Sequence, residues 1–410
     1  MSAPPVTIQR IFGPRGASPA PWQHARLPEF HLGPKDARER LAAVRLVVVG
    51  CGSVGMQMID NGARQGIGGL CVVDPKVLKP ESLCTHSSIL PEHIGAAKAA
   101  LAAARAAAIC PGADVRFAVG RIQDLRFADL LDFAPTHVLL ASDNLHCEMA
   151  AATLARQLGV PLIQGSVDGS TLTAEARCFS NRDALAPDPV CLWGDAEFRS
   201  LEAGVTYSCA GDVSQGEGIS QPETRSIAQL CTLAASLSGI QLVRDVLGLG
   251  APVRDTVVTY CGYTHQTLVT PIRSRAACPA DHRVWRRVRS ATPLARLSAA
   301  SFLHLVGHAD RSERATFSIV DWTFAEEARC ACGLTLQPRL FLPEAEASVR
   351  CTCGREASVP RFHARHELNL EVLGGAADQP LASLGADVVH YVKVSIAEDE
   401  AFLVVGPEKD

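Results

Sequence analysis

Three glycines stand where an expected buried strand passes into a helix. The stretch LVVVGCGSVG contains Gly50, Gly52 and Gly55, which fit the pattern G-x-G-x-x-G. In this pattern the first glycine permits a tight turn, the second lets the backbone approach phosphate, and the third lets helix and strand pack closely. Free amides and the positive end of the helix dipole then favour an anion. The stretch therefore predicts a nucleotide-binding loop rather than an unliganded turn.

Three charged residues further along the chain indicate which nucleotide binds. Asp74 ends the next expected strand, where an acid can accept hydrogen bonds from ribose hydroxyls. Lys98 begins an alanine-rich helix and could reach phosphates as a point charge, although a solvated lysine would look the same. Asp143 ends the stretch HVLLASD, where its carboxylate could serve as a Mg²⁺ ligand, as a helix N-cap or as both. The glycine loop alone suits an NAD-dependent dehydrogenase, but Lys98 and Asp143 favour ATP with Mg²⁺.

Four cysteines near the C-terminus have the spacing of a metal site. The stretches RCACGLT and VRCTCGRE each carry a C-x-C-G motif, with ligand candidates Cys330, Cys332, Cys351 and Cys353. Four thiolates in two tight pairs match a closed tetrahedral Zn²⁺ site, which is structural because no coordination position stays open. Packing cysteines are the weaker alternative.

The elements that must position these residues alternate between strand and helix. RLVVVG, a helix over Val54–Gln65 and LCVVD form a βαβ unit. The alanine-rich helix, the strands VRFAVG and HVLLASD, the helix NLHCEMAAATLARQLG and the strand VPLIQGSV follow. The pattern loosens from Leu172 to Ser220 and ends in an apolar-faced helix from Arg225 to about Leu247. This order predicts an α/β fold with a Rossmann-like, doubly wound, mainly parallel sheet.

Composition limits the function classes. The 410 residues are 47% hydrophobic and 20% charged, which allows one large domain and a smaller one. A net charge of −4, from 39 basic and 43 acidic residues, gives no sign of a nucleic-acid surface. No apolar run has the length of a signal peptide or a membrane span, and the fifteen cysteines suit a reducing compartment. We expect a cytoplasmic protein with no nucleic-acid or membrane partner.

Five motifs in a fixed order resemble those of the ubiquitin-activating-enzyme superfamily. They are GCGSVG, VVDPKVLKPESLCTH, IGAAKA, LLASDN and GVPLIQGSVDG. This superfamily includes the bacterial adenylyltransferases of thiamine and molybdopterin biosynthesis. The resemblance covers about Arg45–Leu249. It implies ATP-dependent adenylation of the C-terminal carboxylate of a ubiquitin-like or sulfur-carrier β-grasp protein. By resemblance, Asp74 would hold the ribose, Lys98 the phosphates and Asp143 the Mg²⁺.

The resemblance also suggests how the chain divides. Residues 1–38 would be an N-terminal arm, and residues 39–290 an ATP-binding adenylation domain with a catalytic-cysteine loop near 190–220. Residues 291–410 would be a small zinc-ribbon and β module, with strand-like alternation in HYVKVSI and AFLVV. We expect this module to contact a partner such as a ubiquitin-conjugating-enzyme-like protein, and we expect a homodimer.

One departure from the family lies in the loop after the second strand. The family usually has Asn and, three residues later, Arg, where this chain has Ser82 and Thr85. Ser82 can still hydrogen-bond, but Thr85 cannot supply the charge of a guanidinium. His86 fits a family variant in which His follows the Arg. A replacement cation could come across a dimer from the N-terminal arm, from Arg10, Arg15 or Arg26; the alternative is a degenerate, weakly active enzyme.

The expected nucleophile is Cys209, in the polar stretch VTYSCAGDVSQGEG. By resemblance, thiamine-type adenylyltransferases carry their sulfur-bearing cysteine here, and a thiolate is suited to attack an acyl-adenylate. Cys191 is the main rival, whereas Cys231 and Cys261 lie in apolar patterns that suit packing. Relatives often bind a structural zinc in this part of the domain. The candidate ligands for such a second site here are Cys178, Cys191, Cys278 and His282, which form a less complete set than the four C-terminal cysteines.

Three function classes follow. The first is an activating enzyme for a ubiquitin-like protein, in which adenylation precedes thioester formation. The second is a sulfur-carrier adenylyltransferase, and the third is a non-enzymatic scaffold on the same fold. The added zinc module and the mismatch at Thr85 favour the first over a biosynthetic role.

Overall fold

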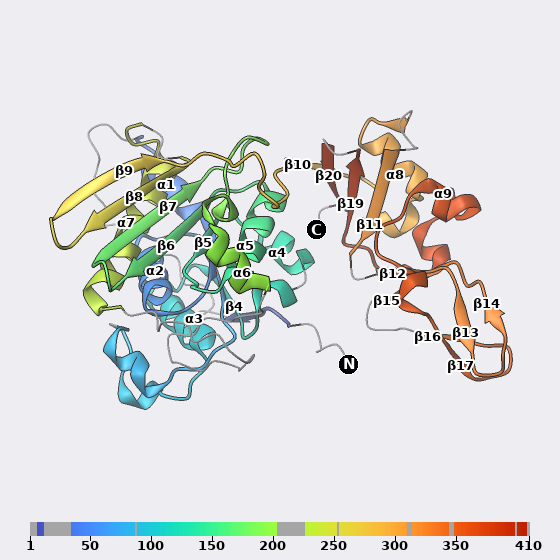
Figure 1. Ribbon diagram of the computed structural model, residues 1–410, viewed down its shortest axis with the longest axis horizontal. Coiled ribbons are helices and arrows are strands. Elements are labelled where there is room, and N and C mark those ends of the chain that lie inside the picture. Colours follow the sequence, from blue (N-terminus) through green and yellow to red (C-terminus); the bar gives the residue numbers. More distant parts are fainter. Residues whose placement is uncertain are drawn as a thin grey trace. The chain divides into compact units, whose positions relative to one another are not determined.

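The computed structural model describes residues 6–11, 34–86, 88–125, 127–202, 226–251, 254–309, 314–320, 322–343, 348–397 and 400–407. The chain forms two compact units, and the first ends at His282 (Figure 1). The second unit therefore begins at Arg283 rather than near residue 290, because strand β10 (Trp285–Arg289) pairs with a strand at the C-terminus. Each unit has its own sheet structure.

The first unit is built on a nine-stranded sheet of order β1-β4-β3-β2-β5-β6-β7-β8-β9. Strands β4, β3, β2, β5 and β6 run parallel to one another, and β1, β7, β8 and β9 add antiparallel edges. The predicted Rossmann-like, mainly parallel sheet is confirmed. The strands are β1 Gln9–Ile11, β2 Arg45–Val49, β3 Gly69–Val73, β4 Asp114–Ala118, β5 His137–Leu140, β6 Leu162–Asp168, β7 Thr173–Phe179, β8 Thr256–Cys261 and β9 Gln266–Pro271.

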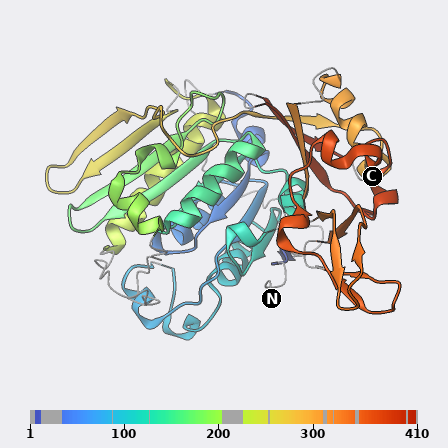
Figure 2. The same ribbon diagram turned by 45° about the vertical axis from the view of Figure 1, so that its right-hand side comes forward.

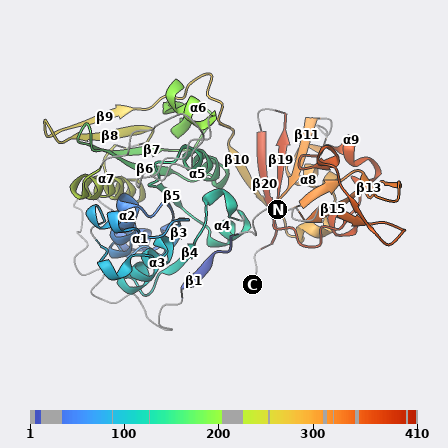
Figure 3. The same ribbon diagram turned by 60° about the horizontal axis from the view of Figure 1, so that its bottom comes forward.

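Helices cover both faces of the parallel part of this sheet (Figure 3). Helices α2, α3 and α7 share one core with the strands, whereas α5 packs against α6 and the short 3-10 helix η5 on the other face. The helices are α1 Ala37–Ala42, α2 Ser53–Arg64, α3 Lys98–Ile109, α4 Phe127–Phe133, α5 Leu145–Leu158, η5 Pro189–Leu192, α6 Asp195–Glu202 and α7 Ala228–Leu247. By length and composition alone α7 could cross a membrane, but its buried face packs on α2, β6 and β7.

Two strands lie where the sequence predicted irregular backbone. In β7, Ala174, Ala176 and Cys178 face the core while Glu175 and Arg177 face outward, which is the period-two alternation of a half-buried strand. Small alanines make this alternation weak in the sequence. In the expected N-terminal arm, β1 pairs antiparallel with β4 and forms an edge of the sheet.

The second unit combines three small sheets (Figure 2). The first has the order β10-β20-β19-β11, and its hairpin β19 (Tyr391–Ile396) and β20 (Glu400–Val405) confirms the two strands predicted in the tail. Burial alternates along β19 from Val392, whereas Ala401–Val405 of β20 are all buried. The hydrophobic core beside this sheet also contains residues of the helices α8 (Ala299–Leu305) and α9 (Leu370–Leu373). The other sheets are β15-β12-β18 and β14-β13-β17-β16, with β11 Ala315–Ile319, β12 Trp322–Ala325, β13 Ala328–Cys330, β14 Thr335–Leu336, β15 Leu340–Pro343, β16 Ser348–Arg350, β17 Glu356–Ser358 and β18 Ala364–Arg365.

Candidate functional site

The three glycines of the loop between β2 and α2 have different surroundings. A Cβ on Gly50, whose φ is +93°, would lie 2.7 Å from the Ala141 carbonyl oxygen, and one on Gly55 would lie 1.9 Å from the Gly50 carbonyl oxygen. Both positions are therefore restricted to glycine by the backbone itself. Gly52 is the N-cap of α2, makes no side-chain cap, and a Cβ there would meet nothing within 4 Å. The open space beside it lies at the helix N-terminus, where an anion is favoured.

Asp74, directly after β3, ties the glycine loop to the neighbouring strand. It is 6% exposed, and its Oδ2 accepts a hydrogen bond from the Cys51 amide at 2.6 Å. Its Oδ1 accepts one from the Lys76 amide at 2.7 Å. Bonds from amides to a carboxylate are charge-assisted and stronger than neutral ones. The expected contact of Asp74 with ribose stays a prediction, but the structure shows that this carboxylate orders the loop.

Lys98 and Asp143 lie at the same carboxyl edge of the sheet as Asp74. Lys98 is the first residue of α3, and Asp143 lies between β5 and α5. Burial, together with the charges of Asp74 and Asp143, raises the pKa of Cys147 to about 11. Burial and Asp74 likewise raise the pKa of Cys51 in the glycine loop, whereas Lys98 opposes them. The charge of Asp74 thus acts on both thiols, together with Asp143 at Cys147 and Lys98 at Cys51, as expected for groups gathered at one edge of the sheet.

The side chains at the family's Asn and Arg positions, Ser82 and Thr85, hydrogen-bond to other residues and present no cation. The Ser82 hydroxyl accepts a hydrogen bond from the Lys79 amide at 3.2 Å. The Ser53 hydroxyl, in the first turn of α2, donates to Thr85 Oγ1 at 2.5 Å. Neither side chain carries charge, so the departure seen in the sequence persists in the folded site.

His86 adds no positive charge at neutral pH. Burial, followed by the nearby charge of Lys98, lowers its pKa to about 4. Its Nδ1 lies 3.0 Å from the Ser82 carbonyl oxygen and 3.1 Å from the Ser53 hydroxyl. Its buried Nε2 has no hydrogen-bond partner among the residues that the structure describes. A neutral imidazole can therefore offer a hydrogen bond at the glycine loop, but it cannot replace a guanidinium.

Of the candidate replacement arginines and the expected nucleophile, the structure describes only Arg10. Arg10 lies on β1, where its Nε is 3.0 Å from Asp114 Oδ1. Asp114 begins β4, so this pair lies at the end of the parallel strands opposite to Asp143. Within its own chain Arg10 is thus not at the nucleotide edge. The other candidates lie outside the described residues, namely Arg15, Arg26 and Cys209.

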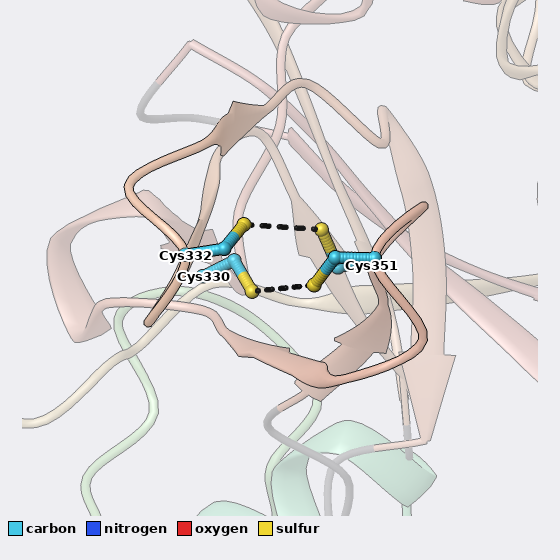
Figure 4. Close-up of side chains that lie close together, drawn as sticks. Cys330, Cys332 and Cys351 are labelled. Atoms are coloured by element: carbon cyan, nitrogen blue, oxygen red, sulfur yellow. Dashed lines mark hydrogen bonds between the residues drawn. The ribbon is translucent and has the colours of Figure 1, made fainter.

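The four C-terminal cysteines come together as predicted (Figure 4). Their sulfur atoms all lie within 4.8 Å of one another, with Cys330 Sγ 3.5 Å from Cys353 Sγ and Cys332 Sγ 3.8 Å from Cys351 Sγ. A tetrahedral zinc with Zn–S bonds of about 2.3 Å places its sulfurs about 3.8 Å apart. The amide of Cys353 lowers the pKa of Cys351 to about 7, whereas the pKa values of Cys330 and Cys353 are raised because the thiols crowd one another. One thiolate therefore forms readily, and metal binding would release the remaining protons. The cluster therefore fits Zn²⁺.

The turns behind these sulfurs explain the glycine after each cysteine pair. Gly333 and Gly354 have φ of +89° and +82°, a region that side chains disfavour. Their amides donate to the carbonyl oxygens of Cys330 and Cys351, each at 2.9 Å. Each C-x-C-G motif thus forms one compact turn that points two sulfurs the same way.

A second cluster lies in the first unit and consists of Asp188, Cys191, Cys278 and His282. Its ligand atoms also lie within 4.8 Å of one another, with Cys191 Sγ 3.5 Å from His282 Nε2. Asp188 stands in place of the predicted Cys178, which is 5% exposed and faces the core from β7. The D-x-x-C spacing was the signal that could have identified it. One carboxylate, two thiolates and an imidazole suit zinc.

Buried Arg156 of α5 joins the two segments that supply this cluster. Its guanidinium is 2% exposed and donates to the carbonyl oxygens of Asp183, Ala186 and His282. Cys191 is 9% exposed within the cluster, which suits a ligand better than a nucleophile. Among the other thiols, Cys231 is buried as predicted, but Cys261 is partly exposed and Thr264 lowers its pKa.

Comparisons with known proteins match the part of the chain that carries this site. A model of the ThiF family matches residues 24–280, more than half of the chain. The SAMP-activating enzyme E1 of Haloferax volcanii is 28% identical over 163 residues, which cover 38% of this chain and 60% of that relative. The sulfur carrier protein adenylyltransferase of Thermus thermophilus is 23% identical over 269 residues, which cover 63% of this chain and 92% of that relative.

Solved structures give weaker matches. A crystal structure of Escherichia coli MccB with AMPCPP and MccA is 13% identical with a TM-score of 0.46, and covers 60% of this chain and 68% of MccB. A crystal structure of PaaA is 17% identical with a TM-score of 0.44, and covers 58% of this chain and 67% of PaaA.

Replacement by alanine should affect stability at Gly55 but nucleotide binding at Gly52. Gly55→Ala should destabilise the first unit by roughly 2 kcal/mol or more, because its Cβ would overlap the Gly50 carbonyl. Gly52→Ala should leave stability near the parent value but weaken nucleotide binding, because its methyl group occupies the open space beside the helix N-terminus. Urea unfolding and ATP calorimetry measure the two effects, and equal loss of stability in both variants would contradict this division.

The two clusters predict two zinc ions per chain. Elemental analysis of Cys330→Ser/Cys332→Ser and of Asp188→Ala/Cys191→Ser should each show one zinc fewer than the parent, and both should lose stability because structural zinc contributes folding energy. Cys84→Ser, which removes an exposed thiol, is the control and should keep the parent zinc content. An unchanged zinc content in either double variant would show that the altered cluster does not bind zinc.

Proposed function

The chain belongs to the ThiF family, and we propose that it uses ATP to activate the C-terminal carboxylate of a small ubiquitin-like β-grasp protein. The observation that carries the proposal is the convergence of the glycine loop, Asp74, Lys98 and Asp143 at one carboxyl edge of the sheet. Ligands bind at this edge in doubly wound folds. The names of the two relatives, a SAMP-activating enzyme and a sulfur carrier protein adenylyltransferase, support the same class of reaction.

The first step joins two anions, so the site must offset their repulsion. An oxygen of the carrier carboxylate attacks the α-phosphorus of ATP, and pyrophosphate leaves with the electron pair of the broken bond. Lys98 and the amides of the glycine loop stabilise the charge that the phosphates carry in the transition state. Mg²⁺ held by Asp143 would supply further positive charge. The product is an acyl-adenylate.

In the second step we propose that Cys209 attacks this acyl-adenylate. Its thiolate sulfur bonds to the acyl carbon, AMP leaves, and a thioester remains for transfer to a conjugating enzyme or target. Cys191 suits this role less because it is buried among three other metal-ligating groups.

The second candidate function is sulfur-carrier adenylyltransferase. It is favoured by the Thermus thermophilus relative, whose length the alignment covers to 92%. In that case the acyl group would receive sulfur rather than pass to a conjugating enzyme. A scaffold without ATP chemistry is the remaining alternative, and the uncharged Thr85 and His86 are the features that favour it.

We also propose a partner-binding role for the second unit. Its large apolar side chains at the surface, Phe362 at 64% and Val388 at 60% exposure, suit contact with another protein. By resemblance the partner would be a ubiquitin-conjugating-enzyme-like protein, and the enzyme would be a cytoplasmic homodimer.

Adenylation is tested by carrier-dependent exchange of pyrophosphate into ATP. Lys98→Ala and Asp143→Ala should each reduce exchange on the order of a hundredfold, because each removes a positioned electrostatic group. Lys76→Ala and Asp132→Ala remove exposed charges of the same types and should stay near the parent rate. Full exchange in either site variant would exclude that residue from the mechanism, and binding of NAD without ATP would overturn the proposal.

The thioester step is tested by intact mass with and without a reducing thiol. Cys209→Ala should keep pyrophosphate exchange but lose the thiol-sensitive adduct with the carrier, because only the attack on the adenylate needs the sulfur. Cys84→Ala should behave as the parent. An adduct that persists in Cys209→Ala and disappears in Cys191→Ala would identify Cys191 as the nucleophile.

A further inference from the structure

A buried ion pair joins the two helices that begin at the nucleotide edge of the sheet. Helix α2 follows the glycine loop, α3 begins at Lys98, and the two helices pack on the same face of the sheet (Figure 3). Asp60 of α2 is 3% exposed, and its Oδ2 accepts a hydrogen bond from the guanidinium of Arg105 in α3 at 2.8 Å. The same oxygen accepts one from the Ser88 hydroxyl at 3.0 Å. One carboxylate thus holds α2, α3 and the loop that connects β3 to α3.

Both members of this ion pair lie two helical turns beyond a residue at the nucleotide edge. Asp60 follows Ser53 by seven residues in α2, and Arg105 follows Lys98 by seven residues in α3. At 3.6 residues per turn, this spacing places both members of each pair on the same side of their helix. Ser53 donates a hydrogen bond to Thr85 of the connecting loop. Helix α2 therefore holds that loop at two points, at Thr85 near its start and again two turns later.

Stability alone does not account for a buried pair of this kind. Asp60 Oδ1 and Arg105 Nε are buried and have no hydrogen-bond partner among the residues that the structure describes. Moving two charges out of water is costly, and apolar side chains of similar volume are often as stable or more stable at such a position. What a hydrogen-bonded ion pair can add is a fixed direction between the elements that it joins.

Helix α3 has a particular need for such a direction, because its buried side chains are all methyl groups. They belong to Ala99, Ala102, Ala103, Ala106 and Ala107. Methyl groups form shallow ridges, so they specify the direction of a helix weakly. The start of α3 is fixed by the Lys98 amide, which donates to the Lys76 carbonyl oxygen at 3.0 Å. The bond from Arg105 to Asp60 supplies a second fixed point two turns further on, and two points define the line of the helix.

We infer that Asp60 is a positioning residue, which through Arg105 sets the direction of α3 and so the place of Lys98 beside the glycine loop. The charge of Lys98 reaches the start of α2 in this structure. Burial and then this charge lower the pKa of His86, whose Nδ1 lies 3.1 Å from the Ser53 hydroxyl. The use of this place, contact of Lys98 with the phosphates of ATP, rests on the proposed function.

The experiment replaces the ion pair by apolar side chains of similar size. Asp60→Leu/Arg105→Met removes both charges together, so neither is left buried without its partner, and the variant should unfold at nearly the parent temperature. Pyrophosphate exchange should nevertheless fall on the order of a hundredfold, because a misplacement of about 1 Å in a reacting group has an effect of that size. Asp36→Leu/Arg40→Met makes the same change in an exposed ion pair at α1, joined at 3.0 Å, and should exchange at the parent rate.

A second background separates positioning from a general effect on stability. In Lys98→Ala, the change Asp60→Leu/Arg105→Met should cause no further loss of exchange, because no amine is left to be misplaced. Residues that act through one another are non-additive in this way, whereas independent effects add. A carboxylate that served stability alone would lower exchange by the same factor with and without Lys98.

Two outcomes overturn the inference. One is a parent rate of exchange in the folded double variant, and the other is an equal further loss when the same change is made in Lys98→Ala. Should the double variant fail to fold, Asp60→Asn keeps the size of the side chain but weakens the bond to Arg105 by removing its charge, and it is compared in the same two backgrounds.

A structural measurement decides the role of Asp60 even without activity. If the parent shows no exchange, the proposed function fails, and crystal structures of the parent and of Asp60→Leu/Arg105→Met are compared after superposition of the parallel strands. Lys98 Cα should lie about 1 Å or more from its parent position, which is the scale on which a misplaced group loses its effect. An unmoved Lys98 would overturn the inference by itself.

Discussion

The carboxylate of Asp74 is the interaction on which the nucleotide edge depends. It accepts one amide from the glycine loop and one from the loop that follows β3, so two backbone segments share a single buried charge. The backbone around the glycine loop is tightly packed, because a Cβ on Gly55 would overlap the Gly50 carbonyl and one on Gly50 would lie 2.7 Å from the Ala141 carbonyl oxygen. The loop amides are thus already positioned by protein contacts, which favours electrostatic stabilisation of a bound anion.

Charge is the feature in which this edge departs from its family. Thr85 is bound to Ser53, and the buried imidazole of His86 is neutral, so neither replaces the missing guanidinium. The described arginine of the N-terminal arm, Arg10, is paired with Asp114 at the other end of the strands. If ATP binds as proposed, Lys98 and the helix dipole would carry a larger share of the phosphate charge than in relatives that keep the arginine.

The two cysteine-containing clusters lie in different structural settings. The core of the ribbon is small: its buried residues are Ala325, Ala328, Cys330, Cys351, Ala357 and Val359, so two candidate ligands belong to the core themselves. Such a core buries little apolar surface, and a bound metal would supply the missing stability. The cluster around Asp188 instead joins two distant segments over α5, where Arg156 satisfies their buried carbonyl groups.

The sequence by itself determined the parts of this protein whose signals are local. Buried parallel strands read as apolar runs, the glycine loop needs fixed spacing, and each C-x-C-G motif closes its own turn, so the sheet and the ribbon cysteines could be predicted. Only the tertiary structure decided the rest. The edge strand β1, the weakly patterned β7, Asp188 in place of Cys178, and the bonds of Glu148 to Gln164 and Trp193 all depend on partners brought together by folding. A hydrogen bond between residues 45 positions apart leaves no periodicity in a sequence, because its energy depends on where the chain places both groups.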